Sequence, residues 1–342
     1  MVDLSYKKGG KSMGTFCIYK YYYYNLSTEE RNIYDKLSSA IKNRQKEVLL
    51  TSKEVPQRYF NNIDRAFEAL CYDNVLLFYA DTTNYKYTKC PDGMVENVYC
   101  EIEYDRSKML TKAISDKCFD IARKFADKFK DYSNYEKALY AHDFLTRRLK
   151  YNEIDGEREY TLCGPLMYGK GVCAGIAKSY KLIMDLLNVP CIVVESETHA
   201  WNMVRLGANS WAHVDVTFDL KGKNYNSHFC FGLCDRKIKQ YKSHIPNRDW
   251  MMPRAENENL TYYHYARSLV HNSYDVEEVL KSTLKGNTSG VIELSFDEKV
   301  NGDKEDIIKT GINSYMIDKP KDSWNIYYYL NSTEDSYIVK VS

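Results

Sequence analysis

The chain has 342 residues, of which 44% are hydrophobic and 28% charged, and its 48 basic residues nearly balance 47 acidic ones. The apolar content and the net charge of +1 exclude a disordered protein, and the absence of a basic excess argues against a nucleic-acid binder. No run approaches the roughly 20 apolar residues that span a bilayer, and the start lacks the apolar stretch of a signal peptide. We therefore expect a cytoplasmic protein of two or three domains that binds neither nucleic acid nor membrane.

The sequence has 10 cysteines, spread through the chain without a Cys-x-x-Cys pair. This distribution disfavours a disulfide scaffold. In a cytoplasmic protein, we expect most of these thiols to be reduced, buried and unreactive.

The first hundred residues predict a small α/β domain. A Ser27-Thr-Glu-Glu30 capping box begins a helix whose apolar residues recur at helical spacing. A Pro91-Asp-Gly93 turn separates two later strands. The expected strands are 16–24, 47–51, 75–79, 85–88 and 98–104, and the second expected helix is 56–70.

Three domains follow from the remaining pattern. The central part predicts helices 110–129, 135–149 and 173–187 and strands 191–197, 199–206 and 211–218. The tail predicts helices 276–284 and 305–316, a strand 291–296 and a hairpin of 324–330 with 337–341. We expect an N-terminal α/β accessory domain (1–106), a central domain (107–272) and a small C-terminal α+β domain (273–342).

Cys173 is the strongest candidate nucleophile. It lies in Gly171-Val-Cys173-Ala-Gly175, at the start of a predicted helix. The free N–H groups and the macrodipole of a helix N-terminus stabilise a thiolate and lower the pKa of the thiol. An isolated cysteine is more often a small buried apolar residue, so the interpretation depends on its partners.

His199 and Asp215 are the candidate partners. Each lies eight residues from Gly207, on consecutive predicted strands. If the hairpin turns around Gly207, the two side chains are directly opposed on one face, within reach of a hydrogen bond. A slip of one residue would put them on opposite faces. Together with Cys173, these residues would then supply a thiolate nucleophile, a histidine acid/base and an acidic residue that orients the histidine.

Other histidines offer alternatives. His213 shares a strand face with Asp215 and could contact that carboxylate itself, although a packed strand histidine is the simpler interpretation. His142 lies in an apolar helical stripe and is expected in the core. His228, Cys230 and Cys234, with His244 following, resemble metal ligands. The residues between them look like core, so we expect no metal site.

Three blocks of this sequence resemble the transglutaminase-like superfamily. They are Gly169-Lys-Gly-Val-Cys173-Ala-Gly-Ile-Ala-Lys-Ser-Tyr180, Thr198-His199-Ala-Trp-Asn202 and Trp211-Ala-His-Val-Asp215-Val-Thr217. Their order and spacing fit together, which is more specific than any one block. The resemblance is strong over residues 135–219 and weaker to about residue 271. It does not cover the first hundred residues or the tail.

The resemblance implies an α+β, papain-like core in which the nucleophile helix packs on an antiparallel sheet. It implies Cys173 as nucleophile, His199 as general acid/base and Asp215 as its orienter. The Cys173 backbone N–H would form part of the oxyanion hole. Tyr168 and Tyr151 are open candidates for the second donor. Trp201 and Trp211 are expected to pack around the triad.

The implied reaction is acyl transfer through a thioester on protein or peptide amides. Water as acceptor makes the enzyme a protease or amidase, and a lysine amine makes it a transglutaminase. We favour hydrolysis, because crosslinking needs a protected channel for a second substrate. No calcium loop is present in the sequence and the mechanism needs no cofactor. The alternative is a binding scaffold with a vestigial triad, in which the accessory domains recognise other proteins.

Overall fold

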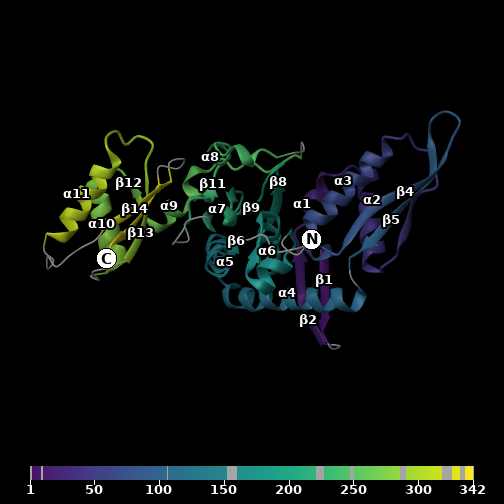
Figure 1. Cartoon of the computed structure of the whole chain (residues 1–342), viewed down its shortest axis with the longest axis horizontal. Helices are drawn as coiled ribbons and strands as arrows, with labels where there is room; N and C mark the ends of the chain where they lie inside the picture. Colours follow the sequence, from purple (N-terminus) through teal and green to yellow (C-terminus); the bar gives the residue numbers. More distant parts are fainter. Residues whose placement is uncertain are drawn as a thin grey trace.

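The computed structural model describes residues 2–8, 11–105, 107–151, 160–220, 227–246, 250–285, 290–317, 326–331 and 336–341. Its elements form an α+β fold, as predicted, drawn out along one axis with N-terminal and C-terminal elements at opposite ends (Figure 1). None of the helices in this described part combines the length and the apolar run needed to cross a bilayer.

The N-terminal part contains a β-hairpin and a three-stranded antiparallel sheet of order β3-β5-β4. The predicted capping box is present: the Ser27 hydroxyl accepts the Glu30 N–H at 3.3 Å, and the Glu30 carboxylate accepts the Ser27 N–H at 2.7 Å. Gly93 turns the chain between β4 and β5 with a φ of +81°. The elements are β1 (Val2–Lys8), β2 (Lys11–Ile18), α1 (Tyr21–Asn25), α2 (Thr28–Lys42), β3 (Glu47–Thr51), α3 (Tyr59–Asp73), η1 (Val75–Leu77), β4 (Ala80–Lys89) and β5 (Val95–Tyr104).

The predicted strand 16–24 is wrong in its second half, where Tyr21–Asn25 form the short helix α1. The Asp73 carboxylate at the end of α3 accepts the backbone N–H groups of Tyr22 and Tyr23, at 3.0 and 2.9 Å. A side chain distant in sequence therefore satisfies the first turn of α1, which local aromatic and β propensity could not indicate.

Two more predicted strands need correction. The predicted strand 75–79 contains a short 3-10 helix, Val75–Leu77. The predicted strand 211–218 stops at Val214, and Val216–Leu220 form α7. Short apolar runs do not distinguish a strand from a buried helical turn, so tertiary packing decides.

In the central part, α6 packs on a four-stranded antiparallel sheet of order β11-β10-β9-β8. The Asn202 side chain on β9 joins the layers, because it donates to the Ala177 carbonyl of α6 at 3.1 Å and to the Ile192 carbonyl of β8 at 3.2 Å. Helices α4 and α5 also contact α6. The elements are α4 (Lys108–Phe129), α5 (Asn134–Arg148), β6 (Lys150–Tyr151), η3 (Gly164–Tyr168), β7 (Lys170–Gly171), α6 (Cys173–Leu186), β8 (Cys191–Glu195), β9 (Ala200–Arg205), β10 (Trp211–Val214), α7 (Val216–Leu220), β11 (Phe231–Leu233), α8 (Asp235–Ile238) and η4 (Lys242–His244).

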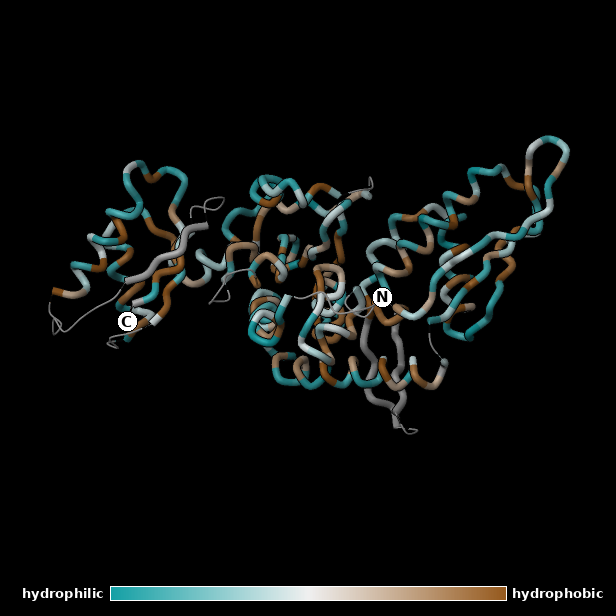
Figure 2. The backbone as a smooth tube through the Cα atoms, viewed as in Figure 1, coloured by the Kyte–Doolittle hydropathy of each residue, from teal (hydrophilic) through white to brown (hydrophobic). Residues whose placement is uncertain are grey.

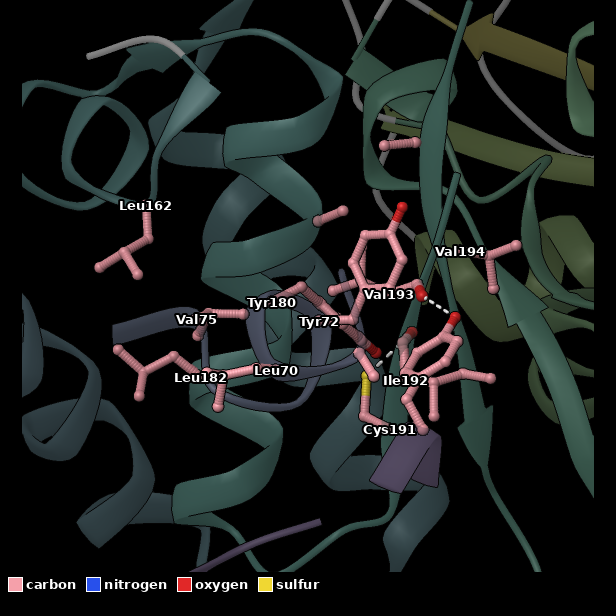
Figure 3. Close-up of a cluster of buried hydrophobic side chains, with 14 of the residues drawn as sticks. Leu70, Tyr72, Val75, Leu162, Tyr180, Leu182, Cys191, Ile192, Val193 and Val194 are labelled. Carbon is pink, nitrogen blue, oxygen red and sulfur yellow. Dashed lines mark hydrogen bonds between the residues drawn. The ribbon is translucent and has the colours of Figure 1, made fainter. Parts of the chain in front are cut away.

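One hydrophobic core joins the N-terminal and central parts, with members from Tyr22 to Ala255. Figure 3 shows Tyr72 from α3 in the same cluster as Tyr180 from α6 and Val193 from β8. The Tyr22 hydroxyl donates to the Val193 carbonyl at 2.5 Å. The accessory elements therefore pack directly on the helix and sheet that carry the candidate site.

A buried ion pair within α6 also holds the N-terminal segment. Lys181 Nζ lies 2.6 Å from Asp185 Oδ1. The Tyr19 N–H donates to the Asp185 carboxylate at 3.2 Å, and the Tyr19 carbonyl accepts from Lys181 at 3.3 Å. Both buried charges thus have a charged partner and a backbone partner, as burial of an ion pair requires.

The C-terminal part has a second core of its own, with members from Val270 to Val339. Its sheet has the order β12-β13-β15-β14, and α10 and α11 pack beside it. The elements are η5 (Glu258–Leu260), α9 (Tyr262–Ala266), β12 (Leu269–Val270), α10 (Ser273–Leu284), β13 (Gly290–Phe296), α11 (Lys304–Met316), β14 (Ile326–Asn331) and β15 (Ser336–Val341). The predicted helices, strand and hairpin of the tail fall within these elements, except that residues 324–325 and the turn at 332–334 lie outside the described residues.

Helical periodicity is the pattern that located the long helices. Figure 2 shows hydrophobic and hydrophilic residues alternating along α4, which the sequence predicts over 110–129. Cys118, Ala122, Phe125 and Ala126 from this helix belong to the main core. An apolar stripe of this kind depends only on side chains three and four residues apart, so the helix can be predicted from the sequence alone.

Candidate active site

Cys173 is the first residue of α6, as the sequence predicts. Val172 precedes it as an extended N-cap residue without a side-chain cap, so the N–H groups of the first turn remain available to other acceptors. The thiol is half-buried, and the backbone N–H groups of Ala174 and Ala200 hydrogen-bond to its sulfur. These donors and the helix macrodipole stabilise negative charge on the sulfur.

His199 lies in the turn that leads into β9. The Ser196 hydroxyl accepts the His199 N–H at 3.0 Å, and the Ser196 N–H donates to the His199 carbonyl at 2.8 Å. The His199 side chain hydrogen-bonds to the Cys173 thiol. The Trp201 ring lies nearly parallel to the His199 ring, with an interplanar angle of 9° and centroids 6.1 Å apart.

Asp215 lies between β10 and α7 and is buried. Its Oδ1 accepts the backbone N–H groups of Thr217 and Phe218, at 2.8 and 3.1 Å. Its Oδ2 lies 2.6 Å from His199 Nε2. Because Nε2 faces the carboxylate, Nδ1 is the ring nitrogen left to face the thiol. The structure therefore brings Cys173, His199 and Asp215 together in one line.

The directions of the pKa shifts of Cys173 and His199 agree with an ion pair between a thiolate and an imidazolium. Burial would raise the pKa of Cys173, but the hydrogen bond and charge of His199 outweigh it, so the thiol pKa is lowered. Burial would lower the pKa of His199, yet the Asp215 and Cys173 hydrogen bonds raise it to about 9. Burial of Asp215 is outweighed by its histidine hydrogen bonds, which hold its pKa below the usual range.

The expected direct opposition of His199 and Asp215 is wrong in detail. In the β9–β10 hairpin Val214 pairs with Asn202 and Trp211 with Arg205, so the symmetry point lies one residue beyond Gly207. His199 and Asp215 are thus offset diagonally, each just outside its strand. Both side chains keep the same face, because moving the symmetry point by one residue shifts the pairing by two positions.

His213 does not contact the triad carboxylate. Its Nδ1 accepts the Trp201 indole N–H at 3.0 Å, and its Nε2 lies 2.9 Å from Asp235 Oδ1. Burial lowers the pKa of His213 despite the Asp235 carboxylate. The alternative in which His213 replaces His199 is therefore excluded, and His213 supports the tryptophan beside the site.

The site contains a histidine that the sequence interpretation missed. His244 Nε2 lies 2.9 Å from Asp215 Oδ2, the same oxygen that faces His199. From the sequence, His244 is a candidate only as a further metal ligand after His228. No spacing rule connects it with Asp215, because α7, β11 and α8 lie between the two residues along the chain.

His142 and His228 form a second buried network. His142 Nε2 lies 3.0 Å from Asp219 Oδ2, and His228 Nε2 lies 2.8 Å from Asp143 Oδ1. His228 Nδ1 lies 2.9 Å from Glu293 Oε1 on β13, so the network reaches the C-terminal part. His142 is buried as predicted, but it is hydrogen-bonded rather than packed only among apolar groups.

Three groups of side chains in the described part of the chain have donor atoms within 4.8 Å of one another. Neither Cys230 nor Cys234, the metal ligands considered from the sequence, belongs to any of them, and Cys230 packs in a small apolar cluster with Leu233. A metal bound at Asp215 would compete with the histidine proton donors. The groups are His199, Asp215 and His244; His142, Asp143 and His228; and Glu54, Cys90 and Glu96.

The residues considered around the triad lie in different places. Trp201 borders His199, whereas Trp211 packs on the rings of Tyr19 and Tyr21, at 5.9 and 6.2 Å between centroids. Tyr151 on β6 pairs with Gly171, two residues before the nucleophile, and is exposed. Tyr168, at the end of η3, is also exposed. The second oxyanion donor stays a prediction.

Comparison with known proteins identifies the central part. The sequence profile of the Transglutaminase-like superfamily matches residues 123–216, and no curated protein sequence matches the chain. A solved TGase structure is 13% identical, with a TM-score of 0.28 over 40% of this chain and 45% of that one, so this chain spans less than half of it. The periplasmic domain of TgpA from Pseudomonas aeruginosa is 14% identical, with a TM-score of 0.25 over 44% of this chain and 69% of that one.

A candidate cysteine protease from Cytophaga hutchinsonii is 16% identical, with a TM-score of 0.25 over 41% of this chain and 66% of that one. The profile match is the finding that identifies the family, and it contains the first two blocks quoted from the sequence and the third block up to residue 216. The described core also has the expected layers, with the helix that begins at Cys173 packed on an antiparallel sheet. Over residues 123–216 the chain therefore carries a domain of the transglutaminase-like superfamily.

Proposed function

We propose that this protein is a cysteine-dependent acyl-transfer enzyme that acts on protein or peptide amides through a thioester. Cys173 is the nucleophile, His199 the general acid/base and Asp215 the residue that orients His199. The observation that carries the proposal is the half-buried thiol with a lowered pKa, hydrogen-bonded to a histidine that is itself held by a buried carboxylate.

The comparison among thiols supports this assignment. Burial raises the pKa of Cys71 and of Cys100 to about 12, and it also raises the pKa of Cys191. Burial also acts to raise the pKa of Cys173, but its histidine partner and two backbone donors outweigh burial and lower that pKa. A thiolate is the reactive form of cysteine, so reactivity is expected to concentrate at Cys173.

The proposed cycle has two half-reactions. In the first, the Cys173 sulfur attacks the amide carbonyl, and the Cys173 proton, held on His199 Nδ1, passes to the leaving amine as the C–N bond breaks. In the second, His199 takes a proton from water, whose oxygen attacks the thioester carbonyl. The C–S bond then breaks and the thiol is restored. Asp215 stays ionised and stabilises the imidazolium in both half-reactions.

The acceptor in the second half-reaction is proposed to be water. A lysine amine would need a second binding channel that excludes water, whereas hydrolysis needs only access to the thioester. Cys173 is partly exposed, which supports access of water to the acyl-enzyme. The protein is then a protease or amidase rather than a crosslinking enzyme.

Mass spectrometry of cell lysate incubated with the wild type and with Cys173→Ala tests the function. New peptide termini that depend on Cys173 would support hydrolysis of peptide bonds. A one-dalton gain on glutamine would indicate deamidation, and glutamine–lysine links would indicate transglutamination. Cys100→Ala, which removes a buried thiol of raised pKa, is the matched control and should behave like the wild type.

An activity-based thiol probe tests the alternative of a binding scaffold. Labelling of the wild type that disappears in Cys173→Ala supports the enzyme. Equal labelling of both proteins, or none of either, would contradict the proposed function and favour a vestigial triad.

A further inference from the structure

We infer that His244 is a positioning residue of this active site, a second histidine that holds the triad carboxylate against His199. The inference rests on the proposed function, since it assigns a task within the same site. It starts from one oxygen with two partners: Asp215 Oδ2 lies 2.6 Å from His199 Nε2 and 2.9 Å from His244 Nε2.

The proton positions follow from this sharing. The histidine hydrogen bonds hold the pKa of Asp215 below its usual range, so the carboxylate is ionised and only accepts. Both Nε2 atoms must therefore carry a proton. For His244 this leaves Nδ1, which lies 3.2 Å from the Ser243 hydroxyl. With Nε2 donating to Asp215 and Nδ1 facing that hydroxyl, both ring nitrogens of His244 have a polar partner.

Packing fixes the His244 ring in that orientation. His244 is buried, with an exposed fraction of 1%. Its ring centroid lies 4.6 Å from Trp201, 4.9 Å from Phe218 and 4.9 Å from His199. Among the described residues, Asp215, His199 and Tyr241 contact the His244 ring directly, and His213 is close enough to interact with it electrostatically. The cavity that His244 borders is also lined by the charged residues Asp235, Lys239 and Arg254. Within this packing the two ring nitrogens of His244 hydrogen-bond to Asp215 and to the Ser243 hydroxyl.

The fold places the segment of His244 beside the turn of His199. An isolated antiparallel bridge pairs Ser196 with Pro246, two residues after His244. Ser196 is the residue whose hydroxyl accepts the His199 N–H. The same short turn thus holds His199 on one side and the His244 segment on the other, so the two histidines keep a fixed separation.

The consequence concerns the orientation of the carboxylate. Asp215 Oδ1 accepts two backbone N–H groups, whereas within the described ranges the two histidines are the hydrogen-bond partners of Oδ2. Without His244, Oδ2 would lose a fixed donor on the side away from His199, and a buried acceptor that loses a partner rotates or recruits water. His199 would then be held less firmly in the tautomer and position that serve Cys173.

The test uses the pH profile of Cys173 alkylation by iodoacetamide, which needs no substrate. In His244→Leu we expect labelling at pH 6 to slow about tenfold and the acid midpoint to move to higher pH, because the thiolate–imidazolium pair is weakened. In His244→Gln the side-chain N–H can still donate, so labelling should stay within about threefold of the wild type.

A control and a rescue separate positioning from packing. His228→Leu removes another buried histidine that touches neither Asp215 nor His199, and it should lower thermal stability without changing the profile. His244 borders a cavity of about 400 Å³, which gives small molecules a route to its place. Added imidazole should therefore partly restore labelling in His244→Ala, while leaving Cys173→Ala unlabelled.

The outcomes are distinct. If wild-type Cys173 labels no faster than Cys71 and Cys90, which are also only partly buried, the proposed function fails. If the wild type labels selectively and folded His244→Leu has the same rate and midpoint, only the positioning role fails. A midpoint that moves to lower pH in His244→Leu would show that His244 competes with His199 for Asp215, which also overturns the inference.

Discussion

Two histidine–carboxylate networks lie in the central part, one of them extending to Glu293 of the C-terminal part, and they differ in whether a ring nitrogen is left to face a reactive group. The site network links His199, Asp215 and His244 and continues to a half-buried thiol. In the second network, His142 contacts both Asp219 and Asp143. Asp143 also contacts His228, which in turn contacts Glu293. In the second, every histidine ring nitrogen faces a carboxylate.

The charges of the two networks differ accordingly. Asp143 and Glu293 raise the pKa of His228 to about 10, so His228 is a stable cation between two anions. The pKa of His199 is raised to about 9 by one carboxylate and one thiol, and its proton is shared with a group that can react. A histidine surrounded by carboxylates holds structure, whereas one placed between a carboxylate and a thiol can move a proton.

Asp215→Asn gives the largest expected effect and tests the site network. The amide N–H would favour the wrong His199 tautomer, so turnover in the identified reaction should fall about 10²–10⁴-fold. Asp215 is only 1% exposed and accepts from His199, His244, Thr217 and Phe218, so a stability loss of about 1–3 kcal/mol should accompany it. Steady-state kinetics and denaturant unfolding measure the two. Unchanged turnover would make Asp215 purely structural.

Alkylation near pH 6 tests the thiol that distinguishes the networks. Cys173 should label at least about tenfold faster than any other cysteine, because its pKa is lowered whereas burial raises the pKa of Cys71 and of Cys100. His199→Ala should abolish most of this advantage. Residue-by-residue mass spectrometry gives the rates. Equal rates at Cys173 and at Cys90, which is also only partly buried, would remove the chemical basis of the assignment.

His228→Leu tests the second network. We expect it to lower the free energy of unfolding by about 2–4 kcal/mol, because Asp143 and Glu293 lose their shared cation. Since the folded pKa of His228 is raised to about 10 from a reference near 6.5, its stabilisation is complete below about pH 6.5 and declines as pH rises to about 10.

The difference in unfolding free energy between wild type and His228→Leu should therefore shrink from pH 6.5 to pH 10. Urea unfolding at several pH values measures it. A difference independent of pH would mean that His228 stabilises by packing on Tyr262, whose ring lies 3.8 Å away, and not by charge.

His213→Phe gives the smallest expected effect. His213 supports Trp201 beside the site but does not touch Asp215. Replacing it should cost about 1–2 kcal/mol, mainly from the unpaired Trp201 N–H, and should change Cys173 alkylation by less than about threefold. A loss comparable with that of Asp215→Asn would show that Trp201 orients His199 more strongly than the carboxylate does.

Local pattern accounts for much of the fold. The Ser27 capping box, the periodic stripe of α4 and the glycine-rich start of α6 each depend on neighbouring residues, and each is present as predicted. The strand expected at 16–24 and the strand expected to run on to 218 failed for different reasons. Asp73, distant in sequence, accepts the first N–H groups of α1. After Val214 the neighbouring Asp215 accepts the N–H groups of Thr217 and Phe218 and so favours the helical turn of α7.

The sequence by itself determined the family blocks, the place of Cys173 at a helix start and the pairing of His199 with Asp215, because these follow from spacing along short segments. Only the tertiary structure decided which remaining histidine meets Asp215. His213 is two residues from Asp215 in sequence but hydrogen-bonds to Trp201 and Asp235. His244 is far from Asp215 in sequence, yet it contacts that carboxylate. Strand parity sets which face a side chain takes, but hydrogen bonds form between atoms that the packed fold brings within about 3 Å.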